Sequence, residues 1–170
     1  MQMQNHFDLF GLAPAFAVEA DALERSYREI QSRVHPDRFA HAGDAERRAS
    51  LQWTTRVNEA YRTLKSPVQR AKYLLEMNGV DVGFETNTQM PTEFLLRQLE
   101  LREALAGAKQ PAALHELLAQ VRREQRLLEQ GIAQLIDGRK DYAAAAGELR
   151  KLMFLDKLAG EIDQAYERVE

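Results

Sequence analysis

The tripeptide His35-Pro36-Asp37 is the pattern in this 170-residue chain with the clearest chemical use. Proline disfavours helical geometry in the residue before it, so a helix that approaches this site must end there. The turn that follows is a stiff corner with an exposed carboxylate, which suits a charge-assisted hydrogen bond to an arginine of another protein. An ordinary helix C-cap followed by an Asx turn explains the same three residues.

Patterns for catalysis and for cofactor binding are missing from the sequence. The histidines His6, His35, His41 and His115 have no metal-ligand spacing, and the motifs G-x-x-x-x-G-K-[ST], G-x-G-x-x-G and G-x-S-x-G do not occur. The chain also has no cysteine, which excludes disulfides and thiolate chemistry. We therefore expect a protein that is not an enzyme, holds no metal or cofactor, and acts by contacting other proteins.

Composition and charge indicate one compact domain or two small ones, because 45% of the residues are hydrophobic and 29% are charged. No stretch reaches the roughly 18 apolar residues of a membrane span, and the first residues lack the pattern of a secretory signal, so we expect a cytoplasmic protein with no membrane partner. Residues 1–78 carry a net charge of +1 and residues 79–170 a net charge of −4. The two halves are therefore expected to meet different partners.

Helical periodicity accounts for nearly all of the first half. The expected elements are a short helix from Asn5 to Phe10; a helix marked by Leu23, Tyr27, Ile30 and Val34, with Asp21 and Glu24 as a capping box; a helix N-capped by Asp44 and marked by Ala49, Trp53, Val57, Ala60, Tyr61 and Leu64; and a helix from Ser66-Pro67 to Asn78-Gly79. The tripeptide lies between the second and third of these helices. It is therefore expected at the closed end of a helical hairpin.

The second half begins with a connector over residues 79–90, where glycines and Asn87 interrupt the helical period. Residues 91–170 predict a three-helix bundle, because helical stripes are broken only at Gln110-Pro111 and at Asp137-Gly138. The stripes are residues 92–106; Leu114, Leu118, Val121, Gln125, Leu128, Ile132 and Leu135; and Tyr142, Ala145, Leu149, Leu152 and Ile162. Because strand patterns are absent, the predicted fold class is all-α, with domains 1–78 and 91–170.

The helix over residues 92–106 carries more apolar side chains than one buried face can take. If Phe94, Leu101 and Leu105 form the internal seam, three leucines project on another side beside two acids, and Phe154 points away from the core in a similar surplus at residues 152–155. The resulting patch is Leu95, Leu96, Leu99, Glu100, Glu103 and Phe154. It predicts a site for a partner protein, although docking of the first half or of a second copy would also cover it.

Several segments resemble known co-chaperones. The tripeptide, followed on the next helix by Asn58-Glu59-Ala60-Tyr61-Arg62-Thr63-Leu64, resembles the J-domain family. Four further segments resemble the HscB-type co-chaperone across nearly the whole chain: Phe7-Asp8-Leu9-Phe10-Gly11-Leu12, Arg70-Ala71-Lys72-Tyr73-Leu74-Leu75, Gln98-Leu99-Glu100-Leu101-Arg102-Glu103 and Lys151-Leu152-Met153-Phe154-Leu155-Asp156-Lys157-Leu158. The resemblance implies an N-terminal J-domain, a helical hairpin with flanking short helices, joined to a C-terminal three-helix bundle in an L-shaped two-domain arrangement.

The same resemblance implies a function. J-domains contact a DnaK-type ATPase chaperone and promote its ATP hydrolysis, and the HscB type binds the iron–sulfur cluster scaffold protein IscU and delivers it to the chaperone HscA. The implied chaperone-binding residues are His35, Pro36, Asp37, Arg25, Arg28 and Arg33, and the implied scaffold-binding residues are Leu95, Leu96, Leu99, Glu100, Glu103 and Phe154. The family pattern has another acid at position 107, where this chain has glycine, so the patch is shorter or the helix ends early.

Alternatives remain open at this point. The three arginines also complement the dipole of their helix, and Arg28 can pair locally with Glu24. A J-domain co-chaperone of a different client would show the same patch, and a helical nucleic-acid-binding module would use Arg122-Arg123-Glu124-Gln125-Arg126. Because Glu124 lies among these arginines, a solvated bundle surface is the better interpretation, and we expect no nucleic-acid partner. A monomer is expected, with a weak dimer at high concentration left open.

Overall fold

The computed structural model describes residues 4–83 and 90–169, so half of the predicted connector 79–90, including Asn87, lies outside the described residues. The chain divides into two compact units, Met1–Leu74 and Leu75–Glu170. All regular elements of the described residues are helical, which confirms the all-α class. They are α1 (His6–Leu9), α2 (Ala20–Val34), the 3-10 helix η1 (Pro36–Phe39), α3 (Asp44–Lys65), α4 (Pro67–Met77), α5 (Thr92–Gly107), α6 (Pro111–Ala133), the π-helical turn η2 (Gln134–Gly138) and α7 (Tyr142–Val169).

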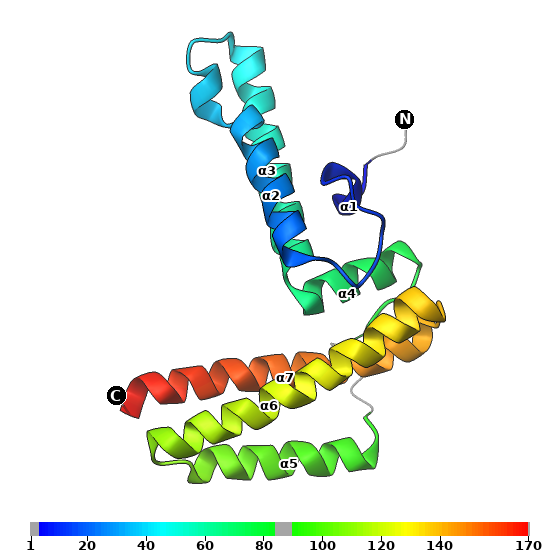
Figure 1. The fold of residues 1–170 in the computed structure, drawn as a ribbon, viewed down its shortest axis with the longest axis vertical. Helices are drawn as coiled ribbons and strands as arrows, with labels where there is room; N and C mark the ends of the chain where they lie inside the picture. Colours follow the sequence, from blue (N-terminus) through cyan, green and yellow to red (C-terminus); the bar gives the residue numbers. More distant parts are fainter. Residues whose placement is uncertain (1–3, 84–89, 170) are drawn as a thin grey trace. The chain divides into compact units, whose positions relative to one another are not determined.

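The first unit is built around a hairpin of α2 and α3, which lie side by side with η1 near their connecting end (Figure 1). The rings of Tyr27 and Tyr61 stack with centroids 4.0 Å apart, and the Tyr27 hydroxyl donates to Asn58 Oδ1 at 2.6 Å. Leu23 of α2 and Val57 of α3 are buried in the same unit. Polar and apolar contacts together therefore fix how the two helices face each other.

The short helix α1 and the first part of α4 complete this unit. Asn5 caps α1 through a reciprocal capping box with Asp8, and Phe7 is fully buried. Arg70 of α4 donates to the carbonyl oxygens of Phe16 and Leu64 at 2.7 and 2.6 Å. The Arg70 guanidinium therefore links α4 by hydrogen bonds to the segment before α2 and to the end of α3.

The second unit contains the three long helices α5, α6 and α7, which lie side by side (Figure 1). Leu101 of α5, Leu114 and Val121 of α6, and Leu155 and Ile162 of α7 are buried together in one core. The predicted three-helix bundle is thus confirmed, including its breaks before Pro111 and near Gly138. No helix among residues 4–83 and 90–169 is both long enough and apolar enough to cross a membrane.

Three local predictions were wrong. Helix α2 begins at Ala20 with Glu19 as N-cap, so Asp21 and Glu24 form no capping box, and Gly43 rather than Asp44 is the N-cap of α3. The stripe of α3 is also shifted, because Ala49 and Trp53 are exposed while Ser50 is buried. The Ser66 cap of α4 was correct, since Gln69 N–H donates to Ser66 Oγ at 3.2 Å.

The titration of His6 should make the stability of the first unit depend on pH. Its ring stacks on Tyr73 with centroids 4.4 Å apart, and burial lowers the pKa of His6, opposed by Glu59 and assisted by Arg56. Because the unfolded chain then binds the proton more readily, the free energy of unfolding should fall as pH drops through the ordinary imidazole range near 6.5. Urea unfolding followed by Trp53 fluorescence at pH 7.5 and 5.5 measures this.

The variant His6→Gln provides the control for this pH dependence. It should lose part of the difference in unfolding free energy between the two pH values, because the perturbed group is gone. An identical pH difference in the variant and the original chain would contradict the assignment to His6.

Candidate partner-binding sites

The His35-Pro36-Asp37 loop is a tight corner whose shape comes from its own backbone. His35 adopts φ −57° and ψ 135°, which ends α2, and Pro36 occupies the first position of η1. The Arg38 N–H donates to the His35 carbonyl oxygen at 3.0 Å, and the Asp37 N–H donates to His35 Nδ1 at 3.2 Å. The predicted turn is therefore present, and His35 supplies one of its hydrogen bonds.

The carboxylate of Asp37 lies in the open. Its side chain is 94% exposed, and its nearest ionic neighbour is His35, with Nδ1 3.6 Å from Oδ2. Because Nδ1 accepts the Asp37 N–H, the neutral ring carries its proton on Nε2 and does not donate to the carboxylate. No hydrogen-bond donor within the described part of the chain reaches that carboxylate, so its acceptor positions can take an external cation.

Two polar side chains of α3 hold the end of α2 in place. Ser50 Oγ donates to the Val34 carbonyl oxygen at 2.6 Å, and Thr54 Oγ1 donates to the same oxygen at 3.2 Å. This carbonyl belongs to the last turn of α2, which has no helical partner for it. Sequence periodicity missed Ser50 and Thr54; the available signal was a pair of hydroxyl residues at i and i+4 where an apolar stripe was expected.

The predicted basic face of α2 is largely neutralised within the helix. Arg28 pairs with Glu24 and Arg33 pairs with Glu29, each at 2.6 Å and each four residues apart. All of these side chains are exposed, which makes such pairs weak. The expected local pairing of Arg28 with Glu24 is thus confirmed. The role of Arg25, Arg28 and Arg33 as a chaperone-binding face stays a prediction.

Removal of the Ser50 hydroxyl should destabilise the first unit. Ser50→Ala leaves the Val34 carbonyl with only the longer bond from Thr54, and we expect a loss of about 1 kcal/mol in the free energy of unfolding. Denaturant unfolding followed by Trp53 fluorescence measures the loss. Thr55→Ala is the matched control, because Thr55 is exposed and bonds only within its own helix; an equal loss in both variants would argue against the cap.

The predicted leucine patch lies on α5 in the second unit. Leu95, Leu96 and Leu99 are 45%, 60% and 59% exposed, whereas Leu101 is buried. The expected surplus of apolar side chains is therefore real within this unit. Isolated exposed leucines are ordinary, but three within two helical turns are the pattern of a contact surface.

Acids surround these leucines, and the neighbouring cations are engaged. Arg97 Nε donates to Glu124 Oε1 of α6 at 2.8 Å, and Arg97 Nη1 lies 2.9 Å from Glu100 Oε2. The hydrogen bond to Glu124 is the main cause of a raised pKa of Arg97, so the guanidinium stays charged. Glu103 is exposed and has no ion pair with another described residue. The patch therefore presents apolar groups with a negative border.

The prediction that Phe154 points away from the core was wrong. Phe154 is half-buried, packs against the core cluster, and meets Phe94 edge to face with ring centroids 5.8 Å apart. The Arg102 guanidinium lies 5.4 Å from the centre of its ring and is itself paired with Glu161. The structure thus brings Phe154 to the patch through Phe94, the residue before Leu95, as a supporting ring.

These two sites define the class of the protein. A helical hairpin closed by an exposed His-Pro-Asp corner is the arrangement of a J-domain, and here it is joined to a three-helix unit with an exposed leucine face. No group of three or more potential metal ligands occurs among the described residues. The class is that of J-domain co-chaperones with a separate three-helix unit.

Comparisons with known proteins agree with this class. The family model described as the HSCB C-terminal oligomerisation domain matches residues 90–163. A co-chaperone protein HscB homolog from Ralstonia nicotianae is 51% identical over 97% of this chain and 96% of its own length. The structure of chaperone HscB from Vibrio cholerae has a TM-score of 0.85 and 34% identity, with 98% of this chain and 100% of that chain covered. Human co-chaperone protein HscB has a TM-score of 0.90 and 28% identity, with 95% and 81% covered.

The chain belongs to the HscB co-chaperone family. It is accordingly a J-type co-chaperone of iron–sulfur cluster assembly, with chaperone partners in that process. Coverage of nearly the full length means that both units share this relationship.

Proposed function

We propose that this protein binds the iron–sulfur scaffold protein IscU through α5 and delivers it to the DnaK-type chaperone HscA, whose ATPase it stimulates through Asp37. The chain itself performs no covalent chemistry in this scheme. The observation that carries the proposal is the presence of two exposed surfaces of different chemistry on separate units: a nearly fully exposed carboxylate on a fixed corner, and three exposed leucines with an acidic border.

The corner is suited to an arginine of the chaperone. A charge-assisted hydrogen bond is stronger than a neutral one, and it gains most when the carboxylate is already positioned. Here the backbone bonds of η1 and the cap on Val34 position Asp37 before any partner arrives. A contact formed only with the hydrolysing conformation of the chaperone would shift its equilibrium toward that conformation.

The leucine face is suited to an apolar surface of the scaffold protein. Burial of one leucine side chain contributes about 1.5 to 3 kcal/mol, so Leu96 and Leu99 alone are enough to dominate a small interface. Glu100 and Glu103 then favour a partner with cations around its apolar centre. Because both surfaces belong to one chain, the bound scaffold protein is held at a high effective concentration near the chaperone.

The substitution Asp37→Asn should abolish ATPase stimulation and leave scaffold binding unchanged. It removes the charge needed for the arginine contact, while the backbone N–H that shapes the turn is retained. Steady-state ATP hydrolysis by HscA and titration of IscU measure the two effects. Asp21→Asn, an exposed acid in the first turn of α2, is the control and should stimulate normally. Full stimulation by Asp37→Asn would refute the role of the corner.

The double substitution Leu96→Ser and Leu99→Ser should have the opposite effect. It should weaken IscU binding by at least roughly a hundredfold, because two leucine anchors are lost at about 1.5 kcal/mol or more each. ATPase stimulation measured without IscU should stay unchanged, since the first unit is untouched. Leu51→Ser, which alters an exposed leucine of the first unit, is the control for binding. If the double variant binds IscU normally, α5 is not the scaffold site.

Self-association through the same leucines is the second candidate function. The family model that matches residues 90–163 is described as an oligomerisation domain, which favours this alternative. Sedimentation of the original chain and of the Leu96→Ser, Leu99→Ser variant separates the two possibilities. A dimer that disappears in the variant, together with normal IscU binding, would assign the leucines to self-association.

A further inference from the structure

The exposed leucines of α5 continue onto α6. Arg97 of α5 and Glu124 of α6 meet across the two helices and mark the line along which the helices face each other. At about 100° per residue, Leu101 lies on the α7 side of this line, where it is buried. Leu96 and Leu127 lie on the other side, because the helices are antiparallel (Figure 1). Both are exposed, at 60% and 67%, and this side is called the outer α5–α6 face.

The two helices bring opposite charges to the outer α5–α6 face. Glu100 of α5 lies on this face about 60° from Arg97, and Arg123 of α6 lies on it about 100° from Glu124. Glu100 uses Oε2 for its bond to Arg97, and no donor in the described part of the chain reaches its Oε1. Arg123 is exposed and forms no ion pair with another described residue. The face therefore offers an acid on one helix and a cation on the other.

A second copy of the same face matches these groups when its α6 lies over α5. Measured from the contact between Arg97 and Glu124, with about 1.5 Å per residue, Leu96 and Leu127 lie within about 3 Å of the same height along the helices. Glu100 and Arg123 also lie within about 3 Å of one height. A two-fold axis parallel to the helices preserves height and places α5 of each copy on α6 of the other. Leucine then meets leucine and acid meets arginine, and each contact occurs twice.

Charge disfavours the other face-to-face arrangement, with α5 on α5. Glu93 lies on the outer face about 40° from Arg97, so this arrangement would bring Glu93 and Glu100 of one copy over the same acids of the other. Arg97 is engaged with Glu124, and Arg102 is paired with Glu161 of α7. The arginine that remains for the acids of a second copy is Arg123, on α6. Charge complementarity therefore selects α5 on α6.

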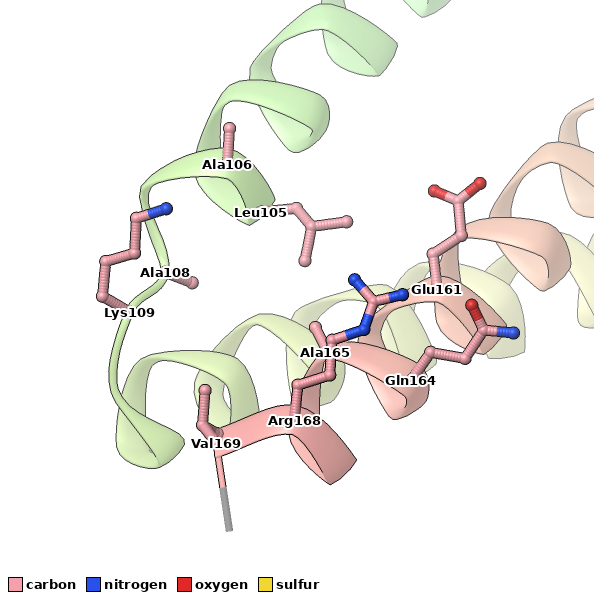
Figure 2. Close-up of a pocket in the computed structure, with 9 residues that line it drawn as sticks. All are labelled: Leu105, Ala106, Ala108, Lys109, Glu161, Gln164, Ala165, Arg168 and Val169. Atoms are coloured by element: carbon pink, nitrogen blue, oxygen red, sulfur yellow. The ribbon is translucent and has the colours of Figure 1, made fainter.

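The surface toward α7 at the end of α5 has a different character. A hollow of about 490 Å³ lies there between the end of α5 and the last turns of α7, and Lys109, Glu161, Gln164 and Arg168 are among its lining residues (Figure 2). These polar side chains interrupt the apolar surface at that end. The surface around Leu96 therefore continues onto α6.

We propose that a second copy of this chain binds to the outer α5–α6 face, with Leu96 on Leu127 and Glu100 on Arg123. The matching family model is described as an oligomerisation domain, which supports self-association and leaves the surface unassigned. Leu96 is also an anchor of the proposed scaffold site, so dimerisation and scaffold binding exclude each other; this part of the inference rests on the proposed function. The dimer keeps the scaffold site closed until IscU competes for it.

The same geometry predicts that the dimer is weak and can be strengthened. Glu103 of one copy lies within about 3 Å of the height of Glu116 of the other, so like charges face each other beyond the arginine pair. Glu116→Lys should therefore tighten the dimer several-fold. Arg123→Glu should raise its dissociation constant at least roughly tenfold, because two acid–arginine contacts become acid–acid contacts.

Sedimentation equilibrium of the full chain, from micromolar to near-millimolar concentration, measures these changes. Arg126→Glu is the matched control, because Arg126 is an exposed arginine of α6 about 200° from Glu124 and so faces away from α5. It should dimerise as the original chain does. The combination of Arg123→Glu with Glu100→Arg should restore the dimer, and denaturant unfolding checks that every variant is folded. A chain that is monomeric at every concentration, or a dimer unchanged by Arg123→Glu, would overturn the inference.

The substitution Leu127→Ser separates the two uses of Leu96. It should weaken the dimer at least roughly tenfold and leave the affinity for IscU unchanged at concentrations where the chain is monomeric. Leu51→Ser, at an exposed leucine of the first unit, should change neither. Addition of IscU to the original chain should convert the dimer into one-to-one complexes. Binding of IscU to an intact dimer would contradict the mutual exclusion.

The failure of this inference is distinguishable from the failure of the proposed function. If Leu96→Ser, Leu99→Ser loses IscU binding while the original chain is monomeric throughout, α5 remains the scaffold site and the dimer is wrong. If the dimer responds to Arg123→Glu and Glu116→Lys as expected while the leucine variant binds IscU normally, the dimer stands and the scaffold site lies elsewhere.

Discussion

The position of the His-Pro-Asp corner depends on one carbonyl group. Pro36 forces α2 to end, and the carbonyl oxygen of Val34 is then left without a helical donor. Ser50 and Thr54 of α3 supply two hydroxyl donors to it, and these bonds fix the end of α2 against the beginning of α3. The corner between the two helices therefore inherits the rigidity of the hairpin, and a carboxylate with few internal contacts still has a defined place.

The first unit holds an exposed carboxylate in place, whereas the second unit keeps apolar side chains exposed and still stays folded. Its stability comes from a core shared by three helices, to which α5 contributes little beyond Leu101 and the partly buried Leu105. Ion pairs from Arg97 to Glu124 and from Arg102 to Glu161 hold α5 against α6 and α7. Because these cations are engaged in holding the helix, the acids Glu100 and Glu103 set the charge around the exposed leucines.

Periodicity predicted most of the fold and the placement of the leucines, because both depend on local patterns. It predicted the helices, the corner between α2 and α3, and the surplus at Leu95, Leu96 and Leu99. Periodicity failed where the type or orientation of a side chain is set by a group on a neighbouring element. The inner stripe of α3 begins with Ser50 and Thr54 rather than Ala49 and Trp53, since the facing group is a carbonyl oxygen that requires donors. The orientation of Phe154 was missed for a similar reason: its partner Phe94 lies on another helix.

The division into units explains why the proposed function needs no covalent chemistry from this chain. Asp37 is positioned by hydrogen bonds of the first unit, and the leucines of α5 are positioned by the core of the second. Neither set of contacts includes a residue of the other, so each surface can change its affinity without disturbing the other. In the proposed scheme the chain acts by raising the effective concentration of one bound protein near the other, and this effect requires a connection that lets both surfaces be occupied at once. Rigid local sites on separately stabilised units are therefore sufficient for the proposed function.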